Sequence, residues 1–292
     1  MPHINTKGLV SFSRRPKDIY YFYKASFSQE SVLHIATHDW LSRTGVTTGA
    51  TGPDGKLSVV QPVAVYTNLR VVELFVNKKS LGVKSVVSLR QVSWDVPFED
   101  GLNVLEARGR TSQQELTDRV EVRFFPRLSA LADTSIPFRE LAVNVGSTSQ
   151  YTDAAGVVWD ADQPYAPGSW GYTGGGPANT TKNILGSPDD PLYQTVRQGI
   201  ASYRFDVADG RYAVELCFVE HRDLQPGQRV FSVSLNGNPV ITNLDLVKEY
   251  GASRAQARTF QVTANRRQGV TVQFSASRGE PVLSAIRIRK LK

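Results

Sequence analysis

The stretch RYAVELCFVE, residues 211–220, alternates large apolar side chains with other residues at a period of two. Four large apolar side chains would lie on one face of an extended chain: Tyr212, Val214, Leu216 and Phe218. Because successive side chains of a β-strand point to opposite faces of a sheet, this pattern predicts a strand with one buried face.

Similar runs on both sides of this stretch predict a β-sandwich over residues 140–292. Further strands are expected at 141–145, 201–207, 229–235, 259–263, 269–275 and 282–289. The turns ADG at 208–210 and NGNP at 236–239 predict antiparallel hairpins. Residues 150–195 are rich in Gly, Pro, Asp and aromatic residues and predict long ordered loops, where binding sites commonly lie.

Residues 29–126 predict another sandwich, of the seven-stranded immunoglobulin-like type. Its strands are expected at 32–36, 57–67, 71–76, 88–96, 103–108 and 119–125. Turn sequences separate them: GPDG at 52–55, NKKSLG at 77–82 and FEDG at 98–101. Residues 127–139 show no alternation and are interpreted as a linker between the two sandwiches.

Residues 1–28 differ from the rest because they predict a helix, with Pro16 in its first turn and Ile19, Phe22 and Tyr23 on one face. A lone helix of this length is marginal in water. We therefore expect it to lie against the domain that follows or to have lost its own partner. The predicted fold class is all-β: two β-sandwiches with a short N-terminal helix.

Charge, hydrophobicity and cysteine content argue against several classes of protein. The net charge is +7, but the basic runs at 14–15, 266–267 and 287–292 are scattered, which indicates solvated faces and no nucleic-acid partner. No stretch approaches the roughly 20 apolar residues of a membrane helix. Met1 is not followed by a signal peptide, so we expect any export signal to lie upstream. Cys217 is the single cysteine, which excludes an internal disulfide and a cysteine-based metal site.

The first half of the chain resembles known enzymes. GLVSFSRRPKDIYYFYKASF (8–27) resembles the last barrel strand and final helix of bacterial family-2 glycoside hydrolases of the β-galactosidase-like group. Three phrases are similar to the immunoglobulin-like domain after that barrel: VLHIATHDW (32–40), VAVYTNLRVVELFVNKKSLG (63–82) and WDVPFEDGLNVLEARG (94–109). The resemblance implies that residues 1–28 end a catalytic (β/α)8 barrel, that both catalytic glutamates lie upstream, and that the location is periplasmic or extracellular at the cell surface.

The second half resembles the malectin-like carbohydrate-binding family, a galactose-binding-like jelly roll. The matching phrases are VNVGSTSQYTDAAGVVWDAD (143–162), DDPLYQTVRQG (189–199), YAVELCFVE (212–220) and GQRVFSVSLNGNPVITNLDL (227–246). In animal malectin, aromatic side chains and one carboxylate grip a glucose disaccharide. The resemblance places those positions on Tyr172, which is kept, on Gln198, on Arg222 and Asp223, and near Gly279 or Glu280, so most of the gripping residues differ.

The stretch WDADQPYAPGSWGYTGG, residues 159–175, contains the main candidates for sugar binding, because flat aromatic faces cover the apolar surface of a sugar. Trp159, Tyr165, Trp170 and Tyr172 are the aromatic members, and Trp170 and Tyr172 are expected to be exposed. Plugging of the sandwich end by Trp159 and Tyr165 is the equal alternative. Arg222, Asp223 and Glu280 are the candidates for polar contacts.

Catalysis and metal binding receive little support. No acidic pair has a context that favours glycoside hydrolysis, which needs two carboxyl groups flanking the bond. His34 and His38 share a face of an extended chain, but two histidines alone make no metal site. The sequence indicates no cofactor; a structural calcium ion is compatible with such sandwiches, and no ligands for it are identified.

The predicted function is that of a non-catalytic accessory region that binds an oligo- or polysaccharide beside the catalytic barrel of a longer enzyme. The alternative is purely structural sandwiches that brace that barrel or an oligomer interface.

Overall fold

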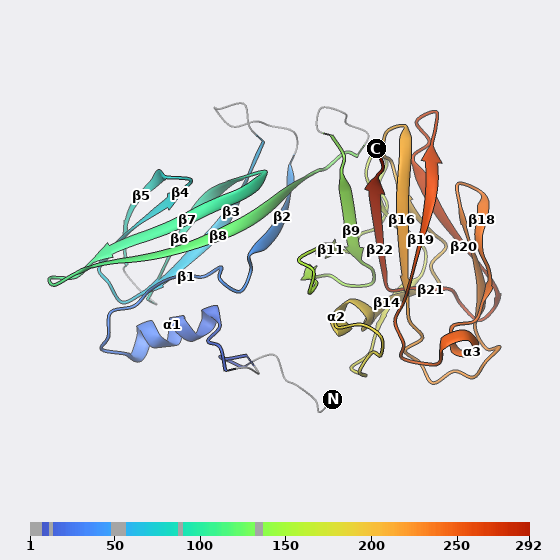
Figure 1. The fold of residues 1–292 in the computed structure, drawn as a ribbon, viewed down its shortest axis with the longest axis horizontal. Helices are drawn as coiled ribbons and strands as arrows, with labels where there is room; N and C mark the ends of the chain where they lie inside the picture. The colour runs from blue at the N-terminus through green and yellow to red at the C-terminus, as the bar shows by residue number, and fades with distance from the viewer. Residues whose placement is uncertain (1–7, 12–13, 48–56, 87–89, 132–136) are drawn as a thin grey trace. The chain divides into compact units, whose positions relative to one another are not determined.

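The computed structural model describes residues 8–11, 14–47, 57–86, 90–131 and 137–292 (Figure 1). The chain divides into two compact units, residues 1–127 and 128–292, which we call unit 1 and unit 2. Strands dominate both units, so the all-β prediction is confirmed. The predicted turn at 52–55 and residues 132–136 of the predicted linker lie outside the described residues. Within the described ranges, no helix has the length and apolar composition to cross a bilayer.

Unit 1 is a sandwich of two sheets. The first sheet has the strand order β1 (Leu33–Ile35), β3 (Ser58–Thr67), β6 (Gln91–Glu99). The second has the order β2 (Ser42–Thr47), β8 (Glu115–Leu128), β7 (Gly101–Arg110), β4 (Val71–Val76), β5 (Lys79–Ser85). Alternate apolar side chains of both sheets form one core, in which the rings of Phe98 and Phe124 stack with centroids 5.2 Å apart. The predicted sandwich is therefore present, with β2 and β5 as unpredicted edge strands.

The turn predicted at 77–82 is shorter than expected. Asn77 and Lys78 have positive φ, 48° and 70°, and β5 begins at the next residue. Two central residues with positive φ are the geometry of the tight hairpin turns that match strand twist. The remaining predicted turn residues therefore continue the sheet as part of its edge.

Helix α1 (Asp18–Phe27) begins two residues after Pro16 and packs on unit 1. Ala25 is buried, and the ring of Phe22 meets that of Tyr66 at a centroid distance of 5.5 Å. Ile19, Phe22 and Tyr23 are spaced as expected for one side of the helix, but that side is only partly buried. Ile19 and Tyr23 are 41% and 44% exposed, because Phe22 alone of the three turns toward the sandwich.

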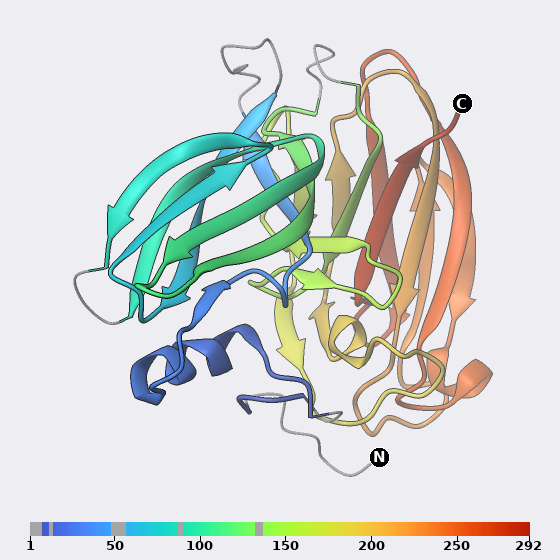
Figure 2. The same cartoon turned by 60° about the vertical axis from the view of Figure 1, so that its left-hand side comes forward.

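Unit 2 has two larger sheets and one small sheet (Figures 1 and 2). The six-stranded sheet runs β10 (Tyr151–Thr152), β11 (Val158–Ala161), β9 (Glu140–Asn144), β22 (Ala285–Lys290), β16 (Gly210–Phe218), β19 (Gln256–Ala264). The five-stranded sheet runs β12 (Trp170–Thr173), β15 (Ser202–Phe205), β20 (Val270–Arg278), β17 (Val230–Leu235), β18 (Asn238–Leu244). The small sheet runs β13 (Gly176–Asn179), β14 (Thr195–Gln198), β21 (Val282–Leu283), and the short helices are α2 (Asp190–Tyr193) and α3 (Leu246–Tyr250).

One of the two predicted hairpins of unit 2 is confirmed. Asn236 and Gly237 both have positive φ and join β17 to its antiparallel partner β18. The turn at 208–210 instead leads from β15 to β16, which belong to different sheets, so the hairpin predicted there was wrong. An alternating pattern identifies strands, but it does not tell a hairpin from a crossing between sheets.

The predicted loop region 150–195 is more regular than expected, since β10 to β13 and α2 all lie within it. Gly146 starts the chain into this region with a φ of +81°, a conformation that side chains with a Cβ rarely adopt. A Cβ added there would lie 2.4 Å from the backbone oxygen of Val196 in β14. The turn after β9 is thus packed directly on the small sheet.

Replacing Gly146 with alanine should separate close packing from backbone strain. Gly156 has nearly the same φ, +82°, but open space where the Cβ would stand. We expect Gly156→Ala to cost about 1–2 kcal/mol from the left-handed conformation alone. Gly146→Ala should cost roughly 1–3 kcal/mol more, because the strand beside it must move. Urea unfolding of the two variants measures the difference, and equal losses would contradict the packing argument.

Candidate functional site

A pocket of about 510 Å³ lies on unit 2 where β13, β14 and the segment after β16 meet. Its walls carry eight residues: Ala178, Asn179, Thr180, Lys182, Gln198, His221, Arg222 and Asp223. Pairing of β13 with β14 brings the segment after residue 176 beside Gln198, with Gly176 opposite Gln198 and Ala178 opposite Val196. Most of the lining side chains can donate or accept hydrogen bonds, so the pocket suits a polar ligand.

Glu220 fixes the segment that carries three of these residues. Its side chain is buried, with Oε1 accepting a hydrogen bond of 2.9 Å from the backbone N–H of Arg222. Its Oε2 lies 2.8 Å from Nη1 of the buried Arg229. Burial raises the pKa of Glu220, and the positive charge of Arg229 opposes that shift. A buried carboxylate held in this way anchors the backbone of the pocket wall.

Some charged side chains of the pocket have a partner within the protein, and one does not. Lys182 Nζ lies 2.6 Å from Asp223 Oδ1, in an exposed pair that contributes little to stability. Gln198 Nε2 donates a hydrogen bond to Glu280 Oε2, which places Glu280 next to the pocket. No described residue forms a hydrogen bond or ion pair with the exposed guanidinium of Arg222. This guanidinium is therefore available to a ligand.

His221 is the one buried imidazole at the pocket. It is 7% exposed, and its Nδ1 has no hydrogen-bond partner among the described residues. Burial, followed by the nearby charges of Arg229, Arg222 and Lys182, lowers the pKa of this histidine. His221 is accordingly held in its neutral form near neutral pH.

The aromatic candidates lie elsewhere, and each has a partner within unit 2. Trp159 is buried and donates from Nε1 to Asp153 Oδ2 at 2.9 Å. Tyr165 donates from its hydroxyl to Asp206 Oδ2 at 2.7 Å. Trp159 is therefore part of the core, as the alternative to sugar binding predicted. Neither Trp159 nor Tyr165 lines the pocket.

The expectation that Trp170 would be exposed was wrong. It is 8% exposed and stacks on the buried ring of Tyr203 with centroids 6.4 Å apart. Tyr172 is half-buried, and the guanidinium carbon of Arg197 lies 3.2 Å from its ring centroid. The glycines that flank both residues indicated an open loop, whereas residues 170–173 form a strand paired with β15.

Arg197 is held in turn by Asp162. Arg197 Nε and the backbone N–H of Gly146 both donate to Asp162 Oδ2, at 2.9 and 2.8 Å, and Tyr203 donates to Oδ1 at 3.0 Å. Both side chains of the ion pair are almost fully buried. Burial raises the pKa of Asp162, and the backbone N–H of Gly146 and then the charge of Arg197 oppose that shift.

The structure brings together Arg222 and Asp223 in the pocket, with Glu280 beside it through Gln198. It does not bring Trp159, Tyr165, Trp170 or Tyr172 into the same pocket. Sequence reasoning missed four lining residues with hydrogen-bonding side chains: Asn179, Thr180, Lys182 and His221. Their polar character alone gave no signal, because such residues are common on any loop.

Family comparisons cover both units. The model of the malectin domain matches residues 140–286, and that of a domain of unknown function, DUF4982, matches residues 59–117. The solved β-glucuronidase of Bacteroides uniformis is 36% identical, with a TM-score of 0.86 over 100% of this chain and 34% of that chain. A β-galactosidase of Bacteroides ovatus is 34% identical over 102 residues, which are 35% of this chain and 10% of that protein.

A protein of Formosa agariphila is 34% identical over 119 residues, which are 39% of this chain and 13% of that protein. The chain thus spans about a third of the solved structure it matches and a much smaller share of the curated relatives. The two matched domains are those that lie in the C-terminal part of family-2 glycoside hydrolases of the β-glucuronidase and β-galactosidase type. The predicted β-galactosidase-like group therefore widens to include β-glucuronidases.

The neutral state of His221 should make stability depend on pH. Its pKa is lowered in the folded state, while an unfolded histidine has a pKa near about 6.5. The contribution of neutral His221 is therefore complete above about pH 6.5 and is lost as the pH falls through the folded-state pKa. We expect the free energy of unfolding, measured with urea, to fall more between pH 7 and pH 5 in the unchanged protein than in His221→Gln. Parallel pH curves for the two proteins would exclude this origin.

Proposed function

We propose, since the chain belongs to the malectin-domain family, that the pocket of unit 2 binds a carbohydrate. One observation carries the proposal. Gln198, Arg222 and Asp223, which match sugar-gripping positions of that family, come from two segments of the chain and line one pocket. The chain would then act as a non-catalytic accessory region of a longer glycoside hydrolase.

The chemistry of the pocket favours hydrogen bonding over stacking. The amides of Asn179 and Gln198 offer donors and acceptors of the kind that bind sugar hydroxyls. Tyr172, the aromatic position that is kept, has its ring face occupied by Arg197. The unpartnered fork of Arg222 matches a carboxylate or a pair of neighbouring hydroxyls. We therefore infer that oligo- or polysaccharides with uronate residues are the preferred class.

Such a module would hold the longer enzyme on its polysaccharide and raise its effective concentration there. The solved relative is itself a β-glucuronidase, which is consistent with a uronate-bearing glycan. The same proposal implies a periplasmic or cell-surface location, because a polysaccharide-binding protein encounters its ligand there.

A glycan array with neutral and uronate-bearing oligosaccharides tests the proposal on the purified chain. We expect binding that Arg222→Ala weakens at least about tenfold, because a hydrogen bond to a charged group contributes about 1.5–3 kcal/mol. Glycans without a carboxylate should show weaker binding and a smaller effect of the variant.

Arg289→Ala is the matched control. Arg289 is also exposed and without a described partner, but it lies opposite Ala213, toward the other end of β16 from the pocket. The Arg289→Ala variant should bind the same glycans as the unchanged protein, with the same affinity. Equal loss in both variants would indicate a general charge effect. No binding to any glycan by the folded chain would overturn the proposal.

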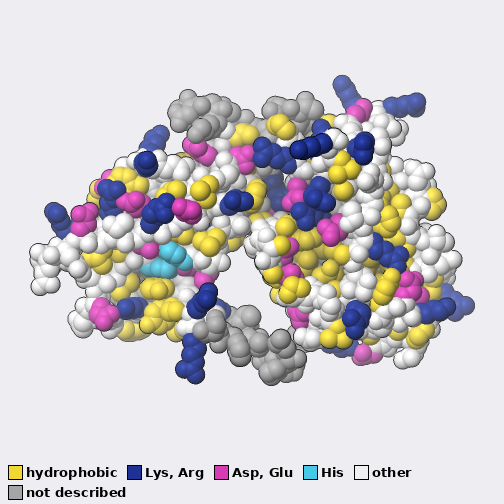
Figure 3. All heavy atoms as spheres, in the orientation of Figure 1, with side chains coloured by type: hydrophobic (Ala, Val, Ile, Leu, Met, Phe, Trp, Pro, Cys, Tyr) yellow, Lys and Arg dark blue, Asp and Glu magenta, His cyan; other side chains and the backbone are white. Residues whose placement is uncertain are grey.

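A structural role is the second candidate, and helix α1 supports it. Ile19, Tyr23 and Phe27 are spaced four apart and form a stripe along the helix, with exposed fractions of 41%, 44% and 81%. Figure 3 shows hydrophobic side chains reaching the surface of unit 1 where α1 lies. Exposed apolar stripes of this kind mark interaction surfaces. The occupant we infer is the catalytic barrel of the longer protein, which the resemblance of residues 8–27 implies.

A further inference from the structure

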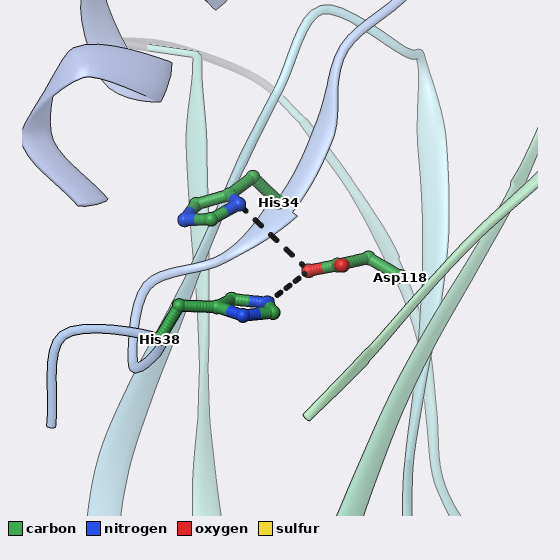
Figure 4. A group of neighbouring side chains, drawn as sticks. All are labelled: His34, His38 and Asp118. Carbon is green, nitrogen blue, oxygen red and sulfur yellow. Dashed lines mark hydrogen bonds and ion pairs between the residues drawn. The ribbon is translucent and has the colours of Figure 1, made fainter. Parts of the chain in front are cut away.

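Unit 1 brings together two neighbouring histidines and an acid that lies far from them in the sequence. His34 lies in β1, His38 in the turn after it, and Asp118 in β8 of the other sheet. One ligand atom from each lies within 4.8 Å of the other two (Figure 4). The sequence showed the two histidines, and the fold adds a third group of the type that metals require.

The distances suit a shared ion. His38 Nε2 lies 3.0 Å from Asp118 Oδ2, and His34 Nδ1 lies 3.9 Å from the same oxygen. Nitrogen and oxygen ligands sit about 2.0–2.2 Å from Zn²⁺, so tetrahedral ligand atoms are roughly 3.3 Å apart. The three ligand atoms lie within 4.8 Å of one another, so each pair would have to approach by at most about 1.5 Å.

The hydrogen bond of His34 to Asp18 leaves the other ring nitrogen of His34 as a possible ligand atom. Its Nε2 faces Asp18 Oδ1 at 2.7 Å, and a carboxylate oxygen can only accept, so Nε2 carries the proton. In the neutral ring, Nδ1 then presents a lone pair to Asp118 Oδ2 (Figure 4). Two acceptors face each other there, and a positive charge between them removes the repulsion.

The surroundings orient the site as metal sites are oriented. The contact of His34 with Asp18 is the carboxylate–histidine arrangement that fixes the ring of a metal-bound imidazole. Tyr21 stacks on the same ring with centroids 3.8 Å apart. The side chain of His34 is 8% exposed and that of His38 is 35% exposed, so the site is closed on one side and open to water on the other.

We propose that His34, His38 and Asp118 bind a divalent transition-metal ion, with Zn²⁺ as the reference ion and a water molecule in the open position. Two imidazoles and one carboxylate suit Zn²⁺ and its neighbours, whereas Ca²⁺ and Mg²⁺ prefer sites made of oxygen. Because β1 and β8 belong to different sheets, the ion joins the two sheets of unit 1 and stabilises the folded state.

Calorimetric titration of Zn²⁺ into the full chain, freed of metal with a chelator, tests the site. We expect one bound equivalent and a rise in the unfolding temperature. His38→Gln and Asp118→Asn should each weaken binding at least about tenfold. Both keep a similar shape, and circular dichroism checks that they fold. His221→Gln removes a histidine of unit 2 and should bind Zn²⁺ like the unchanged protein.

Cobalt gives a second readout. Co²⁺ in a site with these ligands should show visible absorption bands that His38→Gln abolishes and His221→Gln retains. Binding that the His38 and Asp118 variants leave unchanged would overturn the proposal. So would a folded, metal-free chain that binds neither ion.

Discussion

The buried pair of Asp162 and Arg197 is the constraint on which the architecture of unit 2 depends. Its atoms meet the turn at Gly146, the strand β15 through Tyr203, and the backbone oxygen of Gly175. Three further segments of the chain therefore converge on one carboxylate and one guanidinium. Removal of either partner would leave an uncompensated buried charge, which typically costs about 3–5 kcal/mol. The value of such a pair lies in fixing one arrangement of segments, because a well-packed apolar pair can be as stable.

The same pair explains why Trp170, which was expected to be exposed, is buried. Arg197 lies against the ring of Tyr172, and Trp170 stacks on Tyr203, which bonds to Asp162. The aromatic groups thus pack around the ion pair and shield it from water. The neighbour of Arg197 in the chain, Gln198, points instead to the pocket and to Glu280. One strand therefore separates the ion pair from the pocket, since alternate residues of a strand point in opposite directions.

The sequence predicted the long strands with alternating apolar residues and missed short strands and strands at sheet edges. The stretch 211–220 alternates because β16 lies between β19 and β22 and packs on the core. In contrast, β5 is an edge strand whose side chains are almost all exposed, so no alternation marks it. No sequence pattern marks the pocket or the histidine cluster either. Asp118 lies eighty-four residues beyond His34, and its role depends on which sheets face each other, which no local pattern contains.

The polar first turn of helix α1 forms several hydrogen bonds with the rest of unit 1. Asp18 accepts hydrogen bonds from His34 Nε2 and from the backbone N–H groups of His38 and Asp39, and its own N–H donates to the side chain of Asp39. A carboxylate at a helix N-terminus is also favoured by the helix dipole. Because these bonds hold the helix in place, the stripe of Ile19, Tyr23 and Phe27 is not needed for attachment to unit 1. The helix can therefore stay folded on unit 1 while this apolar stripe remains exposed.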